Sequence, residues 1–266
     1  MPASKRIPPS DKSAPLFAAL DLGSNCFHLL IARPEGSSFR ALEAHSVEVR
    51  LAEGLADTMR IGRAAWARGL TVLGEFKERL EAHDVAHVRV VGTQTFRRAQ
   101  NARAFIAEVS ALLARPLDVL SGDEEARLIY LAVSRALKAH SGKLLVVDIG
   151  GASTELIVGK GEVQHLAFST QMGSVTFSAR FFPEGIVTRE GMSAAEEQAK
   201  RELTQRREVL LKAGWDHTLG ASGTLTSLRD IMRLKGWSEG TITQDGLDKL
   251  STALFEARDI SSLSLL

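Results

Sequence analysis

Two acidic residues flank a glycine pair in the segment KLLVVDIGGASTELIVG, which runs from Lys143 to Gly159. Glycine lets backbone N–H groups at a strand end turn inward and form a nest for an anion. An aspartate beside such a nest repels phosphate unless a divalent cation bridges the two, and Mg²⁺ binds one or two carboxylates together with water and phosphate oxygens. We therefore expect Asp148 and Glu155, one at each base of the loop, to hold a cation against a phosphate.

A second segment, FAALDLGSNCFHLLIAR from Phe17 to Arg33, follows the same plan. In both, an apolar strand leads to an aspartate, a glycine and small polar residues before a second strand begins. Asp21 and Asp148 lie about 130 residues apart, which is the length of a typical domain. An ordinary hairpin turn explains one such segment equally well. Two copies at domain spacing favour an ancient duplication in which each half carries a phosphate-sized loop.

A third acidic segment, SGDEEARL, begins at Ser121 and precedes a helical pattern. A helix start explains it well, because Ser121 or Asp123 can cap the first turn and acidic residues there favour the positive helix end. Alternatively, one glutamate projects into a cleft and orients a water molecule as a general base. The residues alone leave both explanations open.

Two further turns precede predicted helices, one at Gly173-Ser174 and one in GASGT, from Gly220 to Thr224. Helix N-termini bind anions through free N–H groups and the helix dipole, and a capping turn explains each sequence equally well. Arg97 follows a predicted strand, and its guanidinium suits a bidentate contact with phosphate, although most such arginines are only solvated.

The composition is that of a soluble globular protein: 266 residues, of which 44% are hydrophobic and 24% charged. Because the formal net charge is only +1, a polyanion must be held by locally focused charge. A lone cysteine, Cys26, excludes an internal disulfide framework and fits a reducing cytoplasm. The sequence has no apolar run of the ~18 residues that a membrane span needs, and no P-loop, dinucleotide-binding or zinc motif. We expect a cytoplasmic protein that binds neither membrane nor nucleic acid.

Short apolar runs alternate with longer helical patterns, which indicates an α/β fold. We expect a disordered tail over residues 1–15, a first domain over 16–140 and a second over 141–266. Strands are predicted within 17–33, 88–92, 117–120, 143–168 and 216–221. Helices are predicted over 70–80, around 105–112, and over 123–137, 175–182, 193–213, 224–232 and 244–257. The segment 93–98 is predicted as a polar loop.

Six motifs occur in the order and spacing of one protein family: FAALDLGSNCFHLLIAR, VVGTQTFR, SGDEEARLIY, LLVVDIGGASTELIVG, QMGSVTF and GASGT. Together they resemble the exopolyphosphatase and guanosine pentaphosphate phosphohydrolase (Ppx/GppA) family, within the superfamily of actin-like ATPases and sugar kinases. The resemblance runs from Phe17 to about Leu265. It implies two ribonuclease-H-like α/β domains that face each other across a cleft. It also implies Mg²⁺-dependent removal of terminal phosphate from inorganic polyphosphate or guanosine pentaphosphate.

The resemblance further implies roles for individual residues. Glu125, the second glutamate of SGDEEARL, would activate water, and Asp148 and Glu155 would carry the metal. The residues implied to contact phosphate are Ser24, Asn25, Arg97, Gly150, Gly151, Ser153, Thr154, Gly173, Ser174, Ser222 and Gly223. Because the transition state of phosphoryl transfer is loose and anionic, positioning and charge neutralisation would supply most of the catalysis.

The sequence departs from the family pattern in three places. Ala152 replaces the third glycine of the metal loop, at a cost of about 1 kcal/mol if the position requires a positive φ. Ser174 stands where some members have cysteine, which is a mild change. The chain ends at SSLSLL, where the family continues with elements that close the second domain, so we expect that domain to be incompletely covered. Members tend to be dimeric, and here a homodimer stays an open expectation.

Two other functions are compatible with the same fold. A kinase of the superfamily would need an acceptor site and an adenosine pocket, and the sequence shows no clear sign of either. A non-catalytic module that binds polyphosphate or an alarmone would bind with Mg²⁺ and leave its ligand intact. The complete set of Glu125, Asp148 and Glu155 argues against such a module.

Overall fold

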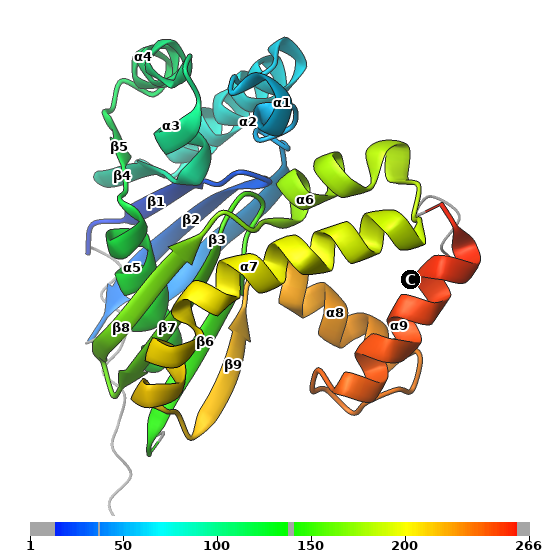
Figure 1. Cartoon of the computed structure of the whole chain (residues 1–266). Coiled ribbons are helices and arrows are strands. Elements are labelled where there is room, and N and C mark those ends of the chain that lie inside the picture. Colours follow the sequence, from blue (N-terminus) through cyan, green and yellow to red (C-terminus); the bar gives the residue numbers. More distant parts are fainter. Residues whose placement is uncertain (1–13, 37, 138–140, 260–266) are drawn as a thin grey trace, which may run out of the picture.

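The computed structural model describes residues 14–36, 38–137 and 141–259, and contains two mixed β-sheets surrounded by helices (Figure 1). Most of the predicted tail, part of the predicted domain junction and the SSLSLL segment lie outside these residues. The α/β class expected from the sequence is confirmed. The predicted domain boundaries stay a prediction. Among the described residues, no helix has both the length and the apolarity needed to cross a bilayer.

The first sheet has the strand order β3-β2-β1-β4-β5. Strands β1 to β3 form an antiparallel meander, whereas β4 and β5 run parallel to β1. The five strands are β1 (Phe17–Leu22), β2 (Cys26–Glu35), β3 (Ser38–Glu48), β4 (His87–Gly92) and β5 (Leu117–Val119). Helices α1 (Leu55–Thr58), α2 (Arg63–Ala82), α3 (Gln94–Arg98) and α4 (Ala102–Leu113) complete this half, which forms the upper part of Figure 1.

The alternation of side chains along β1 decides which residues face the site. Leu20 and Leu22 are fully buried in the core that also contains Phe76 of α2 and Phe105 of α4. Because successive residues of a strand point to opposite faces, Asp21 lies on the face away from this core. The burial of the apolar residues therefore fixes the direction of the acidic one.

The second sheet has the order β8-β7-β6-β9, with β9 parallel to β6. Its strands are β6 (Lys143–Ile149), β7 (Thr154–Lys160), β8 (Val163–Thr170) and β9 (His217–Ala221). The helices that follow β5 are α5 (Gly122–Ala136), α6 (Ser174–Phe181), α7 (Arg189–Ala213), α8 (Gly223–Leu234) and α9 (Gln244–Ala257), with a short 3₁₀ turn at Pro183–Gly185.

Both faces of the second sheet are covered by helices. Tyr130 of α5 packs with Leu144 and Val146 of β6, and Leu210 of α7 packs with Leu145 on the opposite face. Such two-sided burial explains why β6 reads as a continuous apolar run and not as an alternating one. It also anchors α5, whose first turn carries the acidic segment, to the sheet that carries Asp148.

Several local predictions are wrong, including the start of α2, which begins at Arg63 and not at residue 70. The segment 93–98, expected to be a loop, contains α3, because Gln94 and Arg97 lie three residues apart on one helical face and bond to each other. Helix α7 begins at Arg189, four residues before the predicted start, since Thr188 accepts a hydrogen bond from the N–H of Gly191 as an N-cap. Strand β3 falls in a segment with no predicted element, because its first residues are exposed and lack apolar alternation.

Candidate active site

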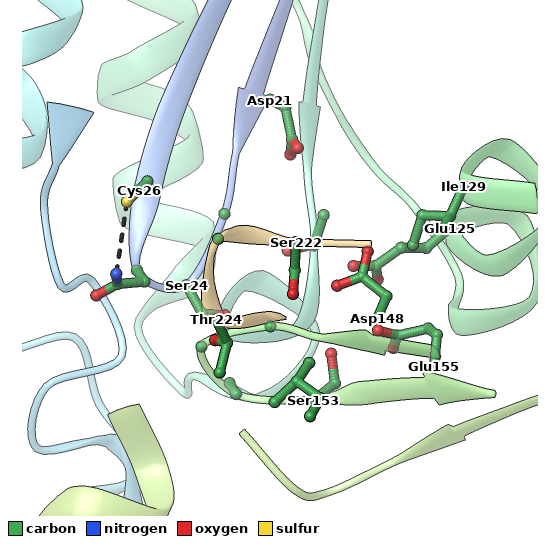
Figure 2. Close-up of a pocket in the computed structure, with 18 of the residues that line it drawn as sticks. Asp21, Ser24, Cys26, Glu125, Ile129, Asp148, Ser153, Glu155, Ser222 and Thr224 are labelled. Carbon is green, nitrogen blue, oxygen red and sulfur yellow. Dashed lines mark hydrogen bonds between the residues drawn. The ribbon is translucent and has the colours of Figure 1, made fainter. Parts of the chain in front are cut away.

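A cavity of about 630 Å³ opens where the two sheets meet (Figure 2). Its wall comes from the β1–β2 loop, the β6–β7 loop and the first residues of α5 and α8. The structure brings most of the sequence-predicted site residues into this wall: Ser24, Asn25, Glu125, Asp148, Gly150, Gly151, Ser153, Glu155, Ser174, Ser222 and Gly223. Arg97, Thr154 and Gly173 are not part of it.

The two similar loops have the same local geometry. The N–H of Gly23 donates to the carbonyl of Cys26 at 3.1 Å, and the N–H of Gly150 donates to the carbonyl of Ser153 at 2.9 Å. In both loops the bonded glycine lies two residues after the aspartate. The loops also approach closely, since a Cβ added to Gly151 would lie 2.8 Å from the backbone nitrogen of Asn25. Only glycine permits this contact, so the pair of loops encloses one end of the cavity.

Helix α6 fixes the orientation of the second loop. The N–H of Ser174 donates to the carbonyl of Gly150 at 2.9 Å, and that of Val175 donates to the carbonyl of Gly151 at 2.9 Å. In a trans peptide the carbonyl and the following N–H point in opposite directions. The N–H groups of Gly151 and Ala152 therefore point away from α6.

The residues predicted to bind phosphate at this helix support the loop in the structure. A Cβ on Gly173 would lie 2.4 Å from the backbone of Ala152, so glycine is needed for the close packing of α6. Thr154 donates through Oγ1 to the carbonyl of Met172 at 2.7 Å. Ala152 is buried and does not adopt a positive φ, so it replaces the family's glycine without backbone strain.

Four carboxyl groups line the cavity, and no lysine or arginine accompanies them in its wall among the described residues. Burial, with added repulsion from Glu125 and Asp21, raises the pKa of Asp148 to about 6. Burial and the charge of Glu125 raise the pKa of Glu155 to about 7. In Figure 2, Glu125, Asp148 and Glu155 point toward one another. Acidic groups that disfavour each other's charge in this way favour the binding of a cation.

Asp21 is a cavity residue that the sequence-based list of site residues omits. Its side chain is accessible from the cavity, and the surrounding protein still removes enough solvent to raise its pKa to about 6. The repeated segments contain the signal that would have found it, because Asp21 occupies the position of Asp148 in the first loop. His28 also lines the cavity, and burial lowers its pKa.

The donor set suits a magnesium ion. Asp148 and Glu155 are direct partners in the β6–β7 register, so their side chains leave the sheet on the same face. Glu155 is only 1% exposed, and Ser169 of β8 donates to its Oε1 at 2.8 Å. No group of three His, Cys, Asp or Glu side chains in the described part of the chain could hold a metal ion. Two carboxylates, with the remaining positions left to water and phosphate, match the preference of Mg²⁺.

Ser222 stands in a strained conformation at the start of α8. Its φ of 97° is in the left-handed region, which is costly for a residue with a Cβ and is typical of functional positions. Its Oγ is buried without a well-formed hydrogen bond, yet lies close enough to Asp148 to lower the pKa of that carboxyl. A buried hydroxyl group therefore lies beside Asp148 at the wall of the cavity.

Glu125 is held at the cavity by α5 and by Arg97. The N-cap Ser121 accepts a hydrogen bond from the N–H of Glu124 at 3.2 Å, so that the helix begins at Gly122 and Glu125 lies in its first turn. Arg97 donates to Oε2 of Glu125 at 2.7 Å, and this ion pair lowers a pKa that burial raises. The partly buried Arg97 thus contacts Glu125 and lies outside the cavity wall, although the sequence predicts it as a phosphate ligand.

We expect Ser121→Ala to destabilise the protein by about 1 kcal/mol, because it removes the side-chain acceptor at the start of α5. Chemical denaturation measures this change. Ser134→Ala in the same helix is the matched control, since Ser134 Oγ donates to a backbone carbonyl within the helix and caps nothing. An equal loss of stability in both variants would contradict the capping role.

Known proteins resemble this chain in sequence and in structure. A model of the Ppx/GppA phosphatase family matches residues 30–266. The chain belongs to this family. It is 39% identical to guanosine-5′-triphosphate,3′-diphosphate pyrophosphatase of Vibrio vulnificus over 253 residues, which cover 95% of this chain and 50% of the relative. It is 35% identical to a putative exopolyphosphatase of Haemophilus influenzae, covering 93% of this chain and 76% of the relative.

The chain therefore spans about half the length of the Vibrio relative that it matches. Among solved structures, the Ppx/GppA family member of Aquifex aeolicus superposes with a TM-score of 0.67 at 27% identity, covering 91% of this chain and 79% of the other. These likenesses confirm the predicted α/β fold class, and the two mixed sheets with their helices are consistent with two ribonuclease-H-like domains.

Proposed function

We propose that this chain is a Mg²⁺-dependent phosphohydrolase that releases the terminal phosphate of inorganic polyphosphate or guanosine pentaphosphate. The observation that carries the proposal is the meeting of two glycine loops and four carboxyl groups in one cavity. Membership of the Ppx/GppA family, and relatives named as enzymes of these two kinds, support it. A cytoplasmic location and a homodimeric state remain predictions.

In this proposal the substrate's terminal phosphate lies between the two loops. Backbone N–H groups and small side chains of Ser24, Asn25, Gly151 and Ser153 surround its oxygens. Ser222 and Gly223 contact the neighbouring phosphate at the first turn of α8. Preorganised donors of this kind stabilise the charge of a loose transition state.

Asp148 and Glu155 are the residues that hold Mg²⁺. When bound, the ion neutralises phosphate oxygens that four nearby carboxyl groups would otherwise repel. Because the cavity wall has no lysine or arginine among the described residues, a polyphosphate end has little other source of positive charge there.

Glu125 removes a proton from the water molecule that attacks the terminal phosphorus. The bond from water oxygen to phosphorus forms as the bridging P–O bond breaks, and the shortened chain leaves with the bridging oxygen. A carboxylate is suited to this task because burial raises its pKa toward the working range, while the Arg97 ion pair keeps the charged form accessible.

The proposal is tested by measuring phosphate release from long-chain polyphosphate and, in parallel, from guanosine pentaphosphate, with Mg²⁺ and with EDTA. We expect release from at least one substrate, and loss of release in EDTA. Binding of both ligands without release, in a folded protein, would contradict hydrolysis and favour a binding module. Transfer of the terminal phosphoryl group to an added acceptor alcohol, with little free phosphate released, would instead indicate a kinase.

A further inference from the structure

A chain of hydrogen bonds leads from Glu125 away from the cavity to Gln94. The Nη1 of Arg97 donates to Oε2 of Glu125 at 2.7 Å and to the carbonyl of Leu120 at 2.7 Å. On the other side of the guanidinium, Nε and Nη2 donate to Oε1 of Gln94 at 3.0 and 2.6 Å. All three nitrogen atoms of the arginine are therefore engaged, and its plane is fixed from both sides.

Of the two residues behind Glu125, Gln94 is buried and Arg97 partly buried, and neither lines the cavity. Gln94 is 8% exposed, and the Arg97 side chain is 19% exposed. Neither belongs to the cavity wall, so their effect on substrate passes through Glu125. Because α3 is also anchored by Thr95, whose Oγ1 donates to Oγ of the cavity residue Ser24 at 2.8 Å, the arginine starts from a fixed position.

Glu125 needs such support because its terminal torsion is otherwise broad. The carboxyl group of a glutamate rotates through a wide range about its last bond, unlike the staggered torsions nearer the backbone. A general base has to keep one oxygen within hydrogen-bond reach of the water that it deprotonates. The bond from Arg97 to Oε2 restricts that rotation, and Gln94 restricts Arg97.

We propose that Gln94 is a positioning residue for Glu125, because it holds the Arg97 guanidinium that orients the Glu125 carboxyl group toward the attacking water. This inference rests on the proposed function. It assigns a role to a polar residue that the sequence motifs placed in a loop. It also assigns Arg97 a contact with the general base, in place of the predicted contact with phosphate.

The test compares Gln94→Met with the wild type in phosphate release from long-chain polyphosphate with Mg²⁺. Methionine keeps the length of the side chain and removes the acceptor. We expect kcat to fall about 10- to 100-fold, the scale of effect that a displaced catalytic group produces, while KM stays within about twofold because no substrate contact is lost. Gln100→Met is the matched control, since Gln100 is exposed beside the same helix, and it should match the wild type.

A double variant separates positioning from general damage to the fold. If Gln94 acts through Glu125, adding Gln94→Met to Glu125→Gln leaves the residual rate of Glu125→Gln unchanged, because the base is already absent. The same fractional loss in both backgrounds, or an unchanged kcat in Gln94→Met, would overturn the inference. Gln94→Asn, which stays polar but is one methylene shorter, should also lower kcat and serves if the methionine variant does not fold.

These outcomes also distinguish the inference from the proposed function. If Glu125→Gln abolishes release while Gln94→Met does not alter it, the base assignment stands and the positioning role is wrong. If Glu125→Gln releases phosphate as fast as the wild type, both the base assignment and the positioning role are wrong.

Discussion

Replacing Glu125 with glutamine is expected to lower kcat for phosphate release by about 10²- to 10⁴-fold, the usual contribution of a general base. Glutamine has the same shape and retains an oxygen that can accept the hydrogen bond from Arg97. It cannot accept a proton from water. Binding of polyphosphate should persist, because no ligand of the phosphate or of the metal is removed.

Glu125→Gln should not destabilise the fold, so a loss of activity in this variant would not come from unfolding. The charge of Glu125 raises the pKa of both Asp148 and Glu155, so its removal relieves repulsion among buried carboxylates. We expect an unchanged or higher midpoint of thermal unfolding at pH 8. Active sites commonly gain stability in this way when a strained functional group is neutralised.

The matched control for this experiment is Glu124→Gln. Glu124 lies in the same helical turn and forms an ion pair with Arg127 at the surface, at 2.8 Å. It has the same charge and the same position relative to the helix dipole, yet it is not in the cavity wall. A comparable loss of kcat in both variants would show that helix electrostatics, and not the base, account for the effect.

The positions of the loop residues and of the acidic helix start can be predicted from the sequence because they depend on local rules. The glycines of the two loops, the aspartate before each loop and the acidic start of α5 are set by turn geometry and by strand alternation, both of which a linear pattern reveals. The same alternation puts Asp148 and Glu155 on one face, as their cross-strand register shows. The repeated plan even contained Asp21, although the list of candidate site residues omitted it.

What the sequence does not reveal is how side chains from distant segments share partners. Arg97 has two acceptors, Gln94 in its own helix and Glu125 in α5, and only the tertiary fold brings the latter within reach. The N-terminus of α6 resembles an anion site in sequence, but its N–H groups bond to the carbonyls of Gly150 and Gly151. Likewise, β3 depends on pairing with β2 and has no apolar pattern of its own.

The acidic cavity predicts a dependence of stability on pH that Mg²⁺ reverses. In the absence of divalent cations, Glu155 has a folded-state pKa of about 7 against an ordinary value of 4.5, and Asp148 has one of about 6 against 3.8. A group whose pKa is raised by folding contributes its full stability below the unfolded value and loses it as the pH rises through the folded value. The free energy of unfolding should therefore fall between about pH 4 and pH 7, by on the order of 3 kcal/mol for Glu155.

Glu43 contributes to stability with the opposite pH dependence, and it titrates mostly below the interval from about pH 4 to pH 7. Hydrogen bonds from His45 and Arg79 lower the pKa of Glu43 to about 2. Its contribution is present above the ordinary pKa of a glutamate, about 4.5, and is lost only in more acidic solution. Between about pH 5 and pH 7 the cavity carboxyl groups therefore lower the stability as the pH rises, and His28, whose pKa burial lowers from 6.5, contributes with the opposite sign.

Mg²⁺ should restore stability where those groups are charged. Because the ion binds carboxylates and not carboxylic acids, it should raise the midpoint of thermal unfolding at pH 8 and have little effect at pH 5. A concentration 100 times the dissociation constant corresponds to about 2.7 kcal/mol. Glu155→Gln should reduce the pH dependence, leaving the part due to Asp148, and abolish most of the Mg²⁺ effect, because it removes one buried charge and one metal ligand.

Glu162→Gln provides the comparison, since Glu162 lies at the tip of the β7–β8 hairpin, is 57% exposed and pairs with Arg135. This variant should retain the pH slope and the Mg²⁺ response of the wild type. An unchanged slope in Glu155→Gln would show that the carboxyl group of Glu155 is not the origin of the pH dependence. If the slope became shallower but Mg²⁺ still stabilised the variant fully, Glu155 would be a buried acid of the cavity and not a metal ligand. The ion would then have to be held by Asp148 and another carboxylate, such as Asp21 beside the facing loop.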